Sequence, residues 1–176
     1  ERVRKMVRDT APFLVIGSPP CTMFSSLQNL SKGKRDKARF DKDMKFAKEH
    51  VKFCLEIYKM QIAAGRYFLH EHPNSAKSWE MPEVVDMVAR EDVDVVMCDM
   101  CAYGLGIADE RGEALVEKRT KLLSNPPELL KRVGVQCENR TAQSEGKKHR
   151  HAGATCGRAT TCQVYPKQFC RAVCAG

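Results

Sequence analysis

Long apolar runs and a secretory leader are both missing from this sequence. The longest apolar run, Pro12 to Ile16, has the length of a buried strand and falls far short of the roughly 20 residues that a membrane helix needs. We therefore expect no membrane partner. Nine cysteines, an odd number in a chain without a leader, argue against a disulfide framework, so we expect a reducing, intracellular setting.

The first residue is Glu1 rather than Met, so we expect the chain to be part of a larger polypeptide. Its 176 residues suit a single domain spanning residues 1–176. Lysine and arginine number 30 against 22 acidic residues, and the net charge of +8 favours a polyanion such as DNA as a partner. A basic soluble protein without nucleic acid is the alternative. Residues 31–45 and 140–155 are polar and basic, and we expect both to be loops, with the frayed entry to a helix as the alternative for residues 31–45.

Two kinds of apolar segment alternate along the chain. Continuous apolar runs are typical of strands buried on both faces, whereas apolar residues at helical spacing predict helices. The expected strands are residues 12–17, 66–71, 92–97 and 121–124, and the clearest helix is residues 43–64. This alternation predicts an α/β fold with a Rossmann-like, mostly parallel sheet and flanking helices. Such folds place their chemistry after the carboxyl ends of strands, where Cys21 and Glu71 both lie.

Two segments resemble catalytic motifs of the cytosine-5 DNA methyltransferase family. Residues 17–25 read Gly-Ser-Pro-Pro-Cys-Thr-Met-Phe-Ser, which is similar to that family's Gly-x-Pro-Cys-Gln-x-Phe-Ser loop, with Thr22 in place of Gln. Residues 66–73 resemble the strand that ends in Glu-Asn-Val in that family. Glu71 keeps the acid there, while His72 and Pro73 replace the other two residues. The order and spacing of the two motifs fit one strand–helix–strand unit.

The resemblance implies a partial methyltransferase fold and a defined chemistry. Cys21 would be the nucleophile that adds to carbon 6 of cytosine, Pro20 its rigid support, and Glu71 the acid that hydrogen-bonds ring nitrogen 3. The methyl group would come from S-adenosylmethionine, and the base would be flipped out of DNA. Residues that would contact the base or the DNA are Ser18, Thr22, Ser25, Lys118, Arg119, His149 and His151.

The sequence also departs from the family. No glycine-rich loop precedes Pro12 to hold the methyl donor, so the site is incomplete or degenerate in this chain. One alternative is a non-catalytic nucleic-acid-binding module of a larger mobile-element-type polyprotein. A second is a zinc-stabilised structural domain. We expect no metal site, but the residues that such a domain would use are Cys137, His149, His151 and Cys156, whose spacing matches no standard zinc finger.

Overall fold

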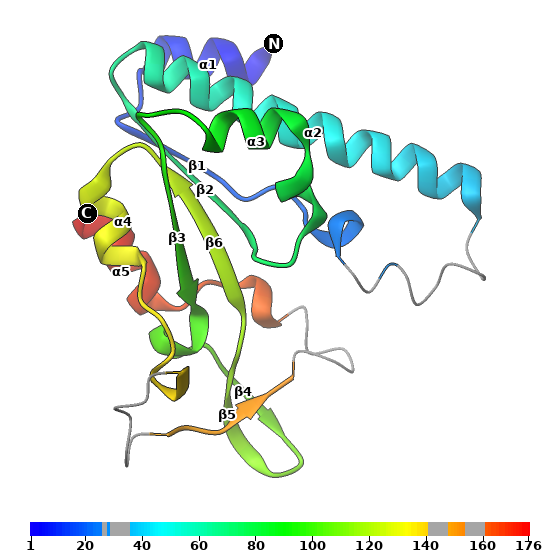
Figure 1. Ribbon diagram of the computed structural model, residues 1–176, viewed down its shortest axis with the longest axis vertical. Coiled ribbons are helices and arrows are strands. Elements are labelled where there is room, and N and C mark those ends of the chain that lie inside the picture. Colours follow the sequence, from blue (N-terminus) through cyan, green and yellow to red (C-terminus); the bar gives the residue numbers. More distant parts are fainter. Residues whose placement is uncertain (26–27, 29–35, 141–147, 154–160) are drawn as a thin grey trace. The chain divides into compact units, whose positions relative to one another are not determined.

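The computed structural model describes residues 1–25, 28, 36–140, 148–153 and 161–176, and Figure 1 labels its elements. The helices are α1 (Arg2–Thr10), α2 (Lys37–Ala63), α3 (Pro82–Val88), α4 (Pro127–Val133) and α5 (Lys167–Ala175). The strands are β1 (Leu14–Gly17), β2 (Tyr67–Pro73), β3 (Asp94–Asp99), β4 (Gly106–Asp109), β5 (Gly112–Val116), β6 (Arg119–Ser124) and β7 (His151–Ala152). Within the described part of the chain, no helix has the length and apolar character needed to cross a membrane.

The chain forms two compact units. Unit 1 comprises Glu1–Val95 with Leu123–Pro126, and unit 2 comprises Val96–Leu122 with Pro127–Gly176. One sheet has the strand order β1-β2-β6-β3, and a second has the order β4-β5-β7. The α/β class expected from the sequence is therefore confirmed. Both sheets are small, and the second is mixed, because β5 pairs antiparallel with β4 and parallel with β7.

Unit 1 is built on a parallel strand pair that α2 covers. Leu14 pairs with Tyr67 and Gly17 with His70, so β1 and β2 end at the same edge. One face of α2 packs onto this pair, with the ring of Tyr58 stacked on Phe68 at 4.5 Å between centroids. The core that results consists of Phe24, Val51, Leu55, Tyr58, Phe68, Ala76, Met81, Val84, Met87, Val93 and Leu123.

Two amide side chains fix the start of these strands. Gln61 is fully buried and donates to the backbone oxygens of Pro12 and Tyr67, at 2.8 and 2.9 Å. Asn125 accepts from the backbone amide of Phe68 at 3.1 Å and donates to the oxygen of Arg66 at 3.0 Å. Because buried polar groups are costly unless bonded, these contacts specify which strand ends lie together.

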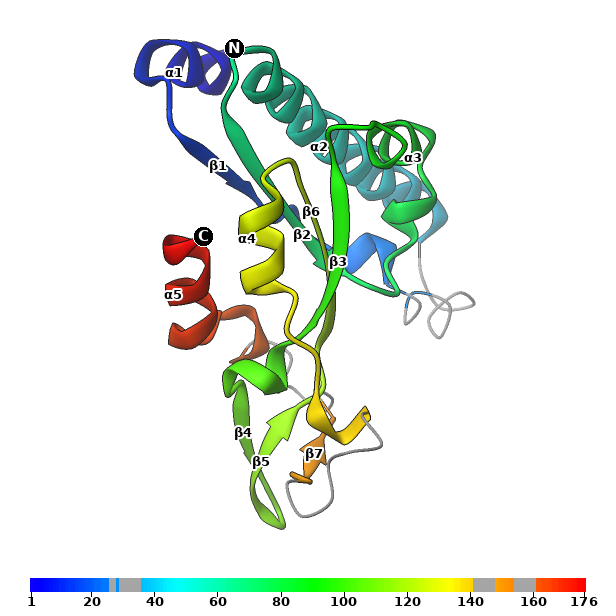
Figure 2. The ribbon, with the colours of Figure 1, turned by 60° about the vertical axis from the view of Figure 1, so that its left-hand side comes forward.

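Unit 2 contains the β4–β5 hairpin, strand β7 and a helix pair. Gly106 pairs with Leu115 across the hairpin, and Gly112, with φ of 95°, makes its turn. The short strand β7 pairs in parallel with β5 through His151 and Leu115. Helices α4 and α5 lie side by side, as Figure 2 shows.

The expected basic loops need correction. Residues 37–45 belong to α2, because Asp36 caps the helix by accepting from the amide of Arg39 at 3.0 Å. Ion pairs one turn apart, such as Lys37 with Asp41 at 3.6 Å, extend the helix through this charged segment. The segment 140–155 contains strand β7, while residues 31–35, 141–147 and 154–155 lie outside the described residues.

Candidate functional site

The loop after β1 is tied to the end of β2 by side-chain hydrogen bonds. Ser18 Oγ donates to Glu71 Oε2 at 2.6 Å. His72 Nε2 lies 3.1 Å from the backbone oxygen of Pro19, and His72 Nδ1 contacts Ser78 Oγ. Because β1 and β2 are parallel and in register, these bonds bring the Cys21 loop and Glu71 to the same edge of the strand pair.

The structure explains the identity of two further motif residues, Gly17 and Phe24. A Cβ atom on Gly17 would lie 1.8 Å from the hydroxyl oxygen of Tyr58, so only glycine fits at this position. The side chain of Phe24 is 2% exposed, lies in the core of unit 1 and meets the ring of His72 edge-on at 5.7 Å. The close approach at Gly17 and the buried Phe24 therefore anchor the loop at both of its ends.

Between these anchors, the loop presents Cys21 near solvent. Cys21 is half-buried, and its backbone oxygen accepts from the amide of Phe24 at 3.0 Å, which opens the short turn Thr22–Phe24. Pro20 and Thr22 are exposed, and Ser25 is half-buried. Glu71 is only 4% exposed. The loop thus carries a half-buried cysteine, and the neighbouring strand carries a buried carboxyl group.

A buried tyrosine–histidine pair supports this edge from behind, and the sequence analysis did not identify it. The hydroxyl of Tyr58 lies 2.9 Å from His70 Nδ1. Burial lowers the pKa of His70 to about 3, with a smaller contribution from the nearby His72. His70 is therefore neutral at physiological pH, and it holds the Tyr58 hydroxyl against Gly17.

The basic residues predicted to contact the base belong to unit 2. Arg119 Nε lies 3.9 Å from the buried carboxylate of Asp99, and its Nη2 donates to Gln136 at 3.1 Å. The ammonium group of Lys118 lies 5.3 Å from the ring centroid of Tyr165. Their contact with DNA or with a base stays a prediction.

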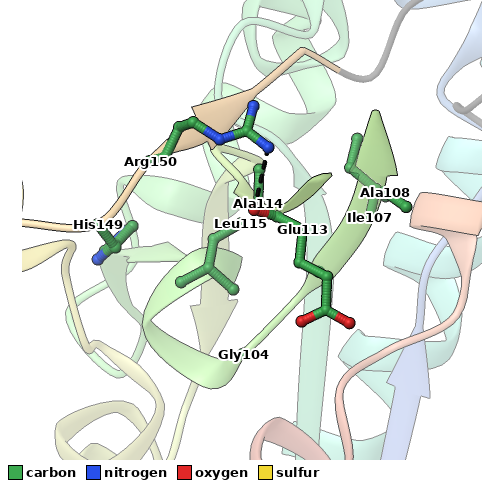
Figure 3. A pocket seen from close by; sticks show the side chains of 9 residues that line it. Gly104, Ile107, Ala108, Glu113, Ala114, Leu115, His149 and Arg150 are labelled. Carbon is green, nitrogen blue, oxygen red and sulfur yellow. Dashed lines mark hydrogen bonds between the residues drawn. The ribbon is translucent and has the colours of Figure 1, made fainter. Parts of the chain in front are cut away.

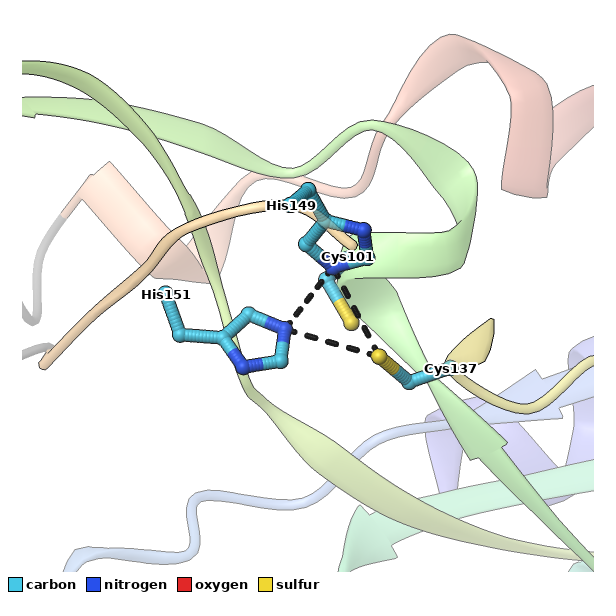
Figure 4. A group of neighbouring side chains, drawn as sticks. All are labelled: Cys101, Cys137, His149 and His151. Atoms are coloured by element: carbon cyan, nitrogen blue, oxygen red, sulfur yellow. Dashed lines mark hydrogen bonds between the residues drawn. The ribbon is translucent and has the colours of Figure 1, made fainter. Parts of the chain in front are cut away.

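The structure brings His149 and His151 together with two cysteines, also in unit 2. The side chains of Cys101, Cys137, His149 and His151 point toward one another, as Figure 4 shows. Burial, and next the neighbouring Cys137, raise the pKa of Cys101 to about 12. Cys156, which the sequence analysis named for this group, lies outside the described residues, and Cys101 was not named. Contact of the two histidines with phosphate remains a prediction.

Each unit has a hollow among its described residues. A cavity of about 660 Å³ lies over β4 and β5 and is shown in Figure 3, with Glu113, His149 and Arg150 on its wall. The guanidinium group of Arg150 in this cavity already donates hydrogen bonds to both carboxylate oxygens of Asp109, at 2.6 and 2.9 Å. The second hollow, of about 460 Å³, is an apolar groove formed by α1, β1 and α2.

The geometry of unit 1 thus ties the loop that carries Cys21 to Glu71 through Ser18, at the ends of two parallel strands, and unit 2 contains a separate group of sulfur and nitrogen side chains. Comparison with protein-family models, with curated proteins and with solved structures found no match to this chain.

Proposed function

We propose that this chain carries the base-attacking part of a cytosine-5 DNA methyltransferase-like site, with Cys21 as nucleophile and Glu71 as its acid partner. The observation that carries the proposal is the 2.6 Å hydrogen bond from Ser18 to Glu71. It joins the cysteine loop after β1 to a carboxyl group near the end of β2. In this proposal the thiol of Cys21 and the carboxyl group of Glu71 face one pyrimidine ring.

The parallel strand pair supports the same proposal. Strands β1 and β2 run parallel, and the Cys21 loop follows the carboxyl end of β1, where α/β folds place their chemistry. The finer assignment, a Rossmann-like sheet of which this is one half, is part of the proposal.

The chemistry proceeds by addition to the ring. The thiolate of Cys21 forms a bond to carbon 6, the electrons of the 5,6 double bond shift toward carbon 4, and nitrogen 3 takes a proton from the carboxylic acid of Glu71. Carbon 5 is now part of an enamine and can accept a proton from water while nitrogen 3 returns its own to Glu71. Loss of one of the two hydrogens on carbon 5 then expels the thiolate and restores the base.

S-adenosylmethionine is the methyl donor that the family resemblance implies, and the described residues do not fit it. A donor pocket of this kind uses a glycine-rich turn that leads from a strand into a helix. The close pair Gly104 and Gly106 instead joins a short turn to strand β4. The chemical steps proposed for this chain therefore do not involve the donor. In this proposal the donor-binding part of the sheet would pair with β1, which stands at one end of the strand order.

Hydrogen exchange at carbon 5 tests the proposal without a donor. Oligonucleotides carrying tritium at carbon 5 of cytosine, single-stranded so that no base must be unstacked from a duplex, should release tritium to water in the presence of the protein. Cys21→Ser should abolish release, and Glu71→Gln should lower its rate by about 100- to 10,000-fold. Cys54→Ser is the matched control, because Cys54 is also half-buried in unit 1 but burial raises its pKa.

The competing function is a nucleic-acid-binding module without catalysis, which the net charge of +8 favours. A module predicts binding that weakens steeply with salt and is unchanged in Cys21→Ser. Wild-type protein that binds the oligonucleotide but releases no tritium would replace the enzymatic proposal with this one. Release that persists in Cys21→Ser would show that another group attacks the base.

A further inference from the structure

The four side chains gathered in unit 2 have the composition and spacing of a metal site. They are the thiols of Cys101 and Cys137 and the imidazoles of His149 and His151, and their ligand atoms all lie within 4.8 Å of one another. Cys101 belongs to the short turn Met100–Tyr103 after β3, and Cys137 follows α4. The histidines stand at the start of β7. Three segments that are distant in the sequence thus meet at one point.

The distances match a tetrahedral zinc centre. Zinc–sulfur bonds of about 2.3 Å and zinc–nitrogen bonds of about 2.0–2.1 Å place a sulfur and a nitrogen ligand about 3.5 Å apart. Cys137 Sγ lies 3.5 Å from Nε2 of His149 and 3.5 Å from Nε2 of His151. The two Nε2 atoms are 2.8 Å apart, about half an ångström closer than the same bond lengths give.

Hydrogen bonding alone does not account for the triangle formed by Cys137 Sγ, His149 Nε2 and His151 Nε2. Each imidazole nitrogen presents a single lone pair or a single N–H in the plane of its ring. It therefore cannot point straight at two neighbours, yet His149 Nε2 and His151 Nε2 each approach Cys137 Sγ and one another. A cation inside the triangle accepts one lone pair from every atom, and two thiolates neutralise the charge of a divalent ion.

The surroundings hold three of the four ligands in place. Glu117 Oε2 lies 3.5 Å from Nδ1 of His151, the usual position for a carboxylate that orients a metal-binding histidine. Asn139 bonds both the oxygen and the amide of His149, at 2.8 and 3.1 Å. The buried carboxylate of Asp99 accepts from the amide of Cys137 at 2.9 Å.

We infer that Cys101, Cys137, His149 and His151 bind one zinc ion, which joins the end of β3, the segment after α4 and strand β7. Four protein ligands leave no open position, so the role of the ion is structural rather than catalytic. The alternation of the residues that lead into β7 agrees with this role. His149 and His151 face the cluster, while Arg150 between them binds Asp109 of the β4–β5 hairpin at 2.6 Å. The inference is independent of the thiol chemistry proposed for unit 1.

Metal content and cobalt spectroscopy of the full chain test the inference. Protein purified without chelator should contain about one zinc per chain, and Co²⁺ in its place should give the intense visible bands of a tetrahedral ion together with thiolate charge-transfer absorption. This measurement uses wild-type protein, so it does not depend on whether a ligand variant folds. Folded wild-type protein that contains no zinc and gives no such cobalt spectrum would overturn the inference.

Variants identify the fourth ligand. Cys101→Ser should lose the stoichiometric zinc, whereas Cys98→Ala should keep it, because Cys98 is equally buried but is not part of the cluster. Cys156→Ser should also keep the zinc. Loss of zinc in Cys156→Ser, or its retention in Cys101→Ser, would show that this ligand set is wrong. Glu117→Gln should weaken zinc binding by about 10- to 100-fold in competition with a chelator.

Discussion

Different interactions stabilise the interior of unit 1 and the interior of unit 2. Unit 1 has a continuous apolar core under a 27-residue helix, and its amide side chains Gln61 and Asn125 make hydrogen bonds to residues distant in the sequence. In unit 2, the second sheet consists of short strands, with β7 only two residues long, and a cluster of two buried cysteines and two half-buried histidines lies beside it. Short strands bury little apolar surface, so this part of the chain needs a cross-link that unit 1 does not.

The two proposals also assign different roles to the cysteines of the two units: chemistry in unit 1 and structural support in unit 2. In unit 1 most of the cysteine loop is fixed by packing: Gly17 against Tyr58, Phe24 in the core, and Ser18 on Glu71. Cys21 in this loop is half-buried, and the proposed function makes its thiol the reactive group. In unit 2, Cys101 and Cys137 are buried and converge on two histidines, where we infer a structural zinc ion. The two proposals thus give cysteine a different role in each unit.

Removal of the metal should produce the largest difference in stability between the two units. Structural zinc sites contribute about 10–16 kcal/mol in small folded domains, more than the total stability of many of them. A strong chelator should therefore abolish amide hydrogen-exchange protection in β4, β5 and β7 while α2 and β2 keep theirs. Added zinc should restore the protection. Equal protection in both units after complete zinc removal would contradict the comparison.

Gly17→Ala should break unit 1 selectively. The new methyl group would lie 1.8 Å from the Tyr58 hydroxyl, which cannot retreat without losing its 2.9 Å contact with His70. Overpacking of this kind lowers the free energy of unfolding by about 1–3 kcal/mol or more. Trp79, the sole tryptophan, lies in unit 1, so its fluorescence during urea unfolding reports on that unit.

Gly106→Ala is the matched control for this substitution. A Cβ atom there would have its nearest neighbour, the oxygen of Ala114, at 3.6 Å, which is ordinary contact. The urea midpoint seen by Trp79 should not change in this variant, because Gly106 belongs to unit 2. A Gly17→Ala protein with a wild-type midpoint would mean that the loop can move away from Tyr58 at little cost.

The sequence predicted the strand pair of unit 1 because its signals are local. The apolar run ending at Gly17 and the run before Glu71 each correspond to a strand, and the resemblance to a family directed attention to the loop between. The start of α2 was missed because charged residues hide helical periodicity. Only the cap at Asp36 and the ion pairs along the helix explain why it begins so early.

The cluster in unit 2 could not be assembled from spacing. Cys98 and Cys101 have the spacing of a Cys-x-x-Cys pair, but Cys98 is buried in β3 and, of the two, Cys101 reaches the histidines. The β4–β5 hairpin was not among the expected strands for a related reason. Glycines at 104, 106 and 112 are typical of a loop, whereas the positive φ of Gly112 makes the tight turn that pairs β4 with β5. In both cases the three-dimensional arrangement, rather than the spacing along the chain, brings the residues together.

Acidic pH should lower the free energy of unfolding of unit 1 through His70. We expect this effect to be smaller than those of zinc removal and of Gly17→Ala. In the unfolded chain this imidazole has a pKa near 6.5, whereas burial lowers the pKa of His70 to about 3 in the folded protein. The unfolded state therefore binds the extra proton first, and stability falls as pH drops below about 6.5, until it levels off below about 3. At pH 5 this linkage amounts to about 2 kcal/mol.

The variant His70→Asn isolates this contribution. Asparagine can still hydrogen-bond the Tyr58 hydroxyl but does not titrate, so the loss of unit 1 stability between pH 7 and pH 5, read from Trp79 fluorescence, should shrink by about 2 kcal/mol. His50→Asn, on the outer part of α2, should leave the loss unchanged. His70 Nδ1 faces Tyr58, and the His70 ring packs against His72 and Trp79. A loss of stability between pH 7 and pH 5 that is as large in His70→Asn as in the wild type would show that His70 is not its source.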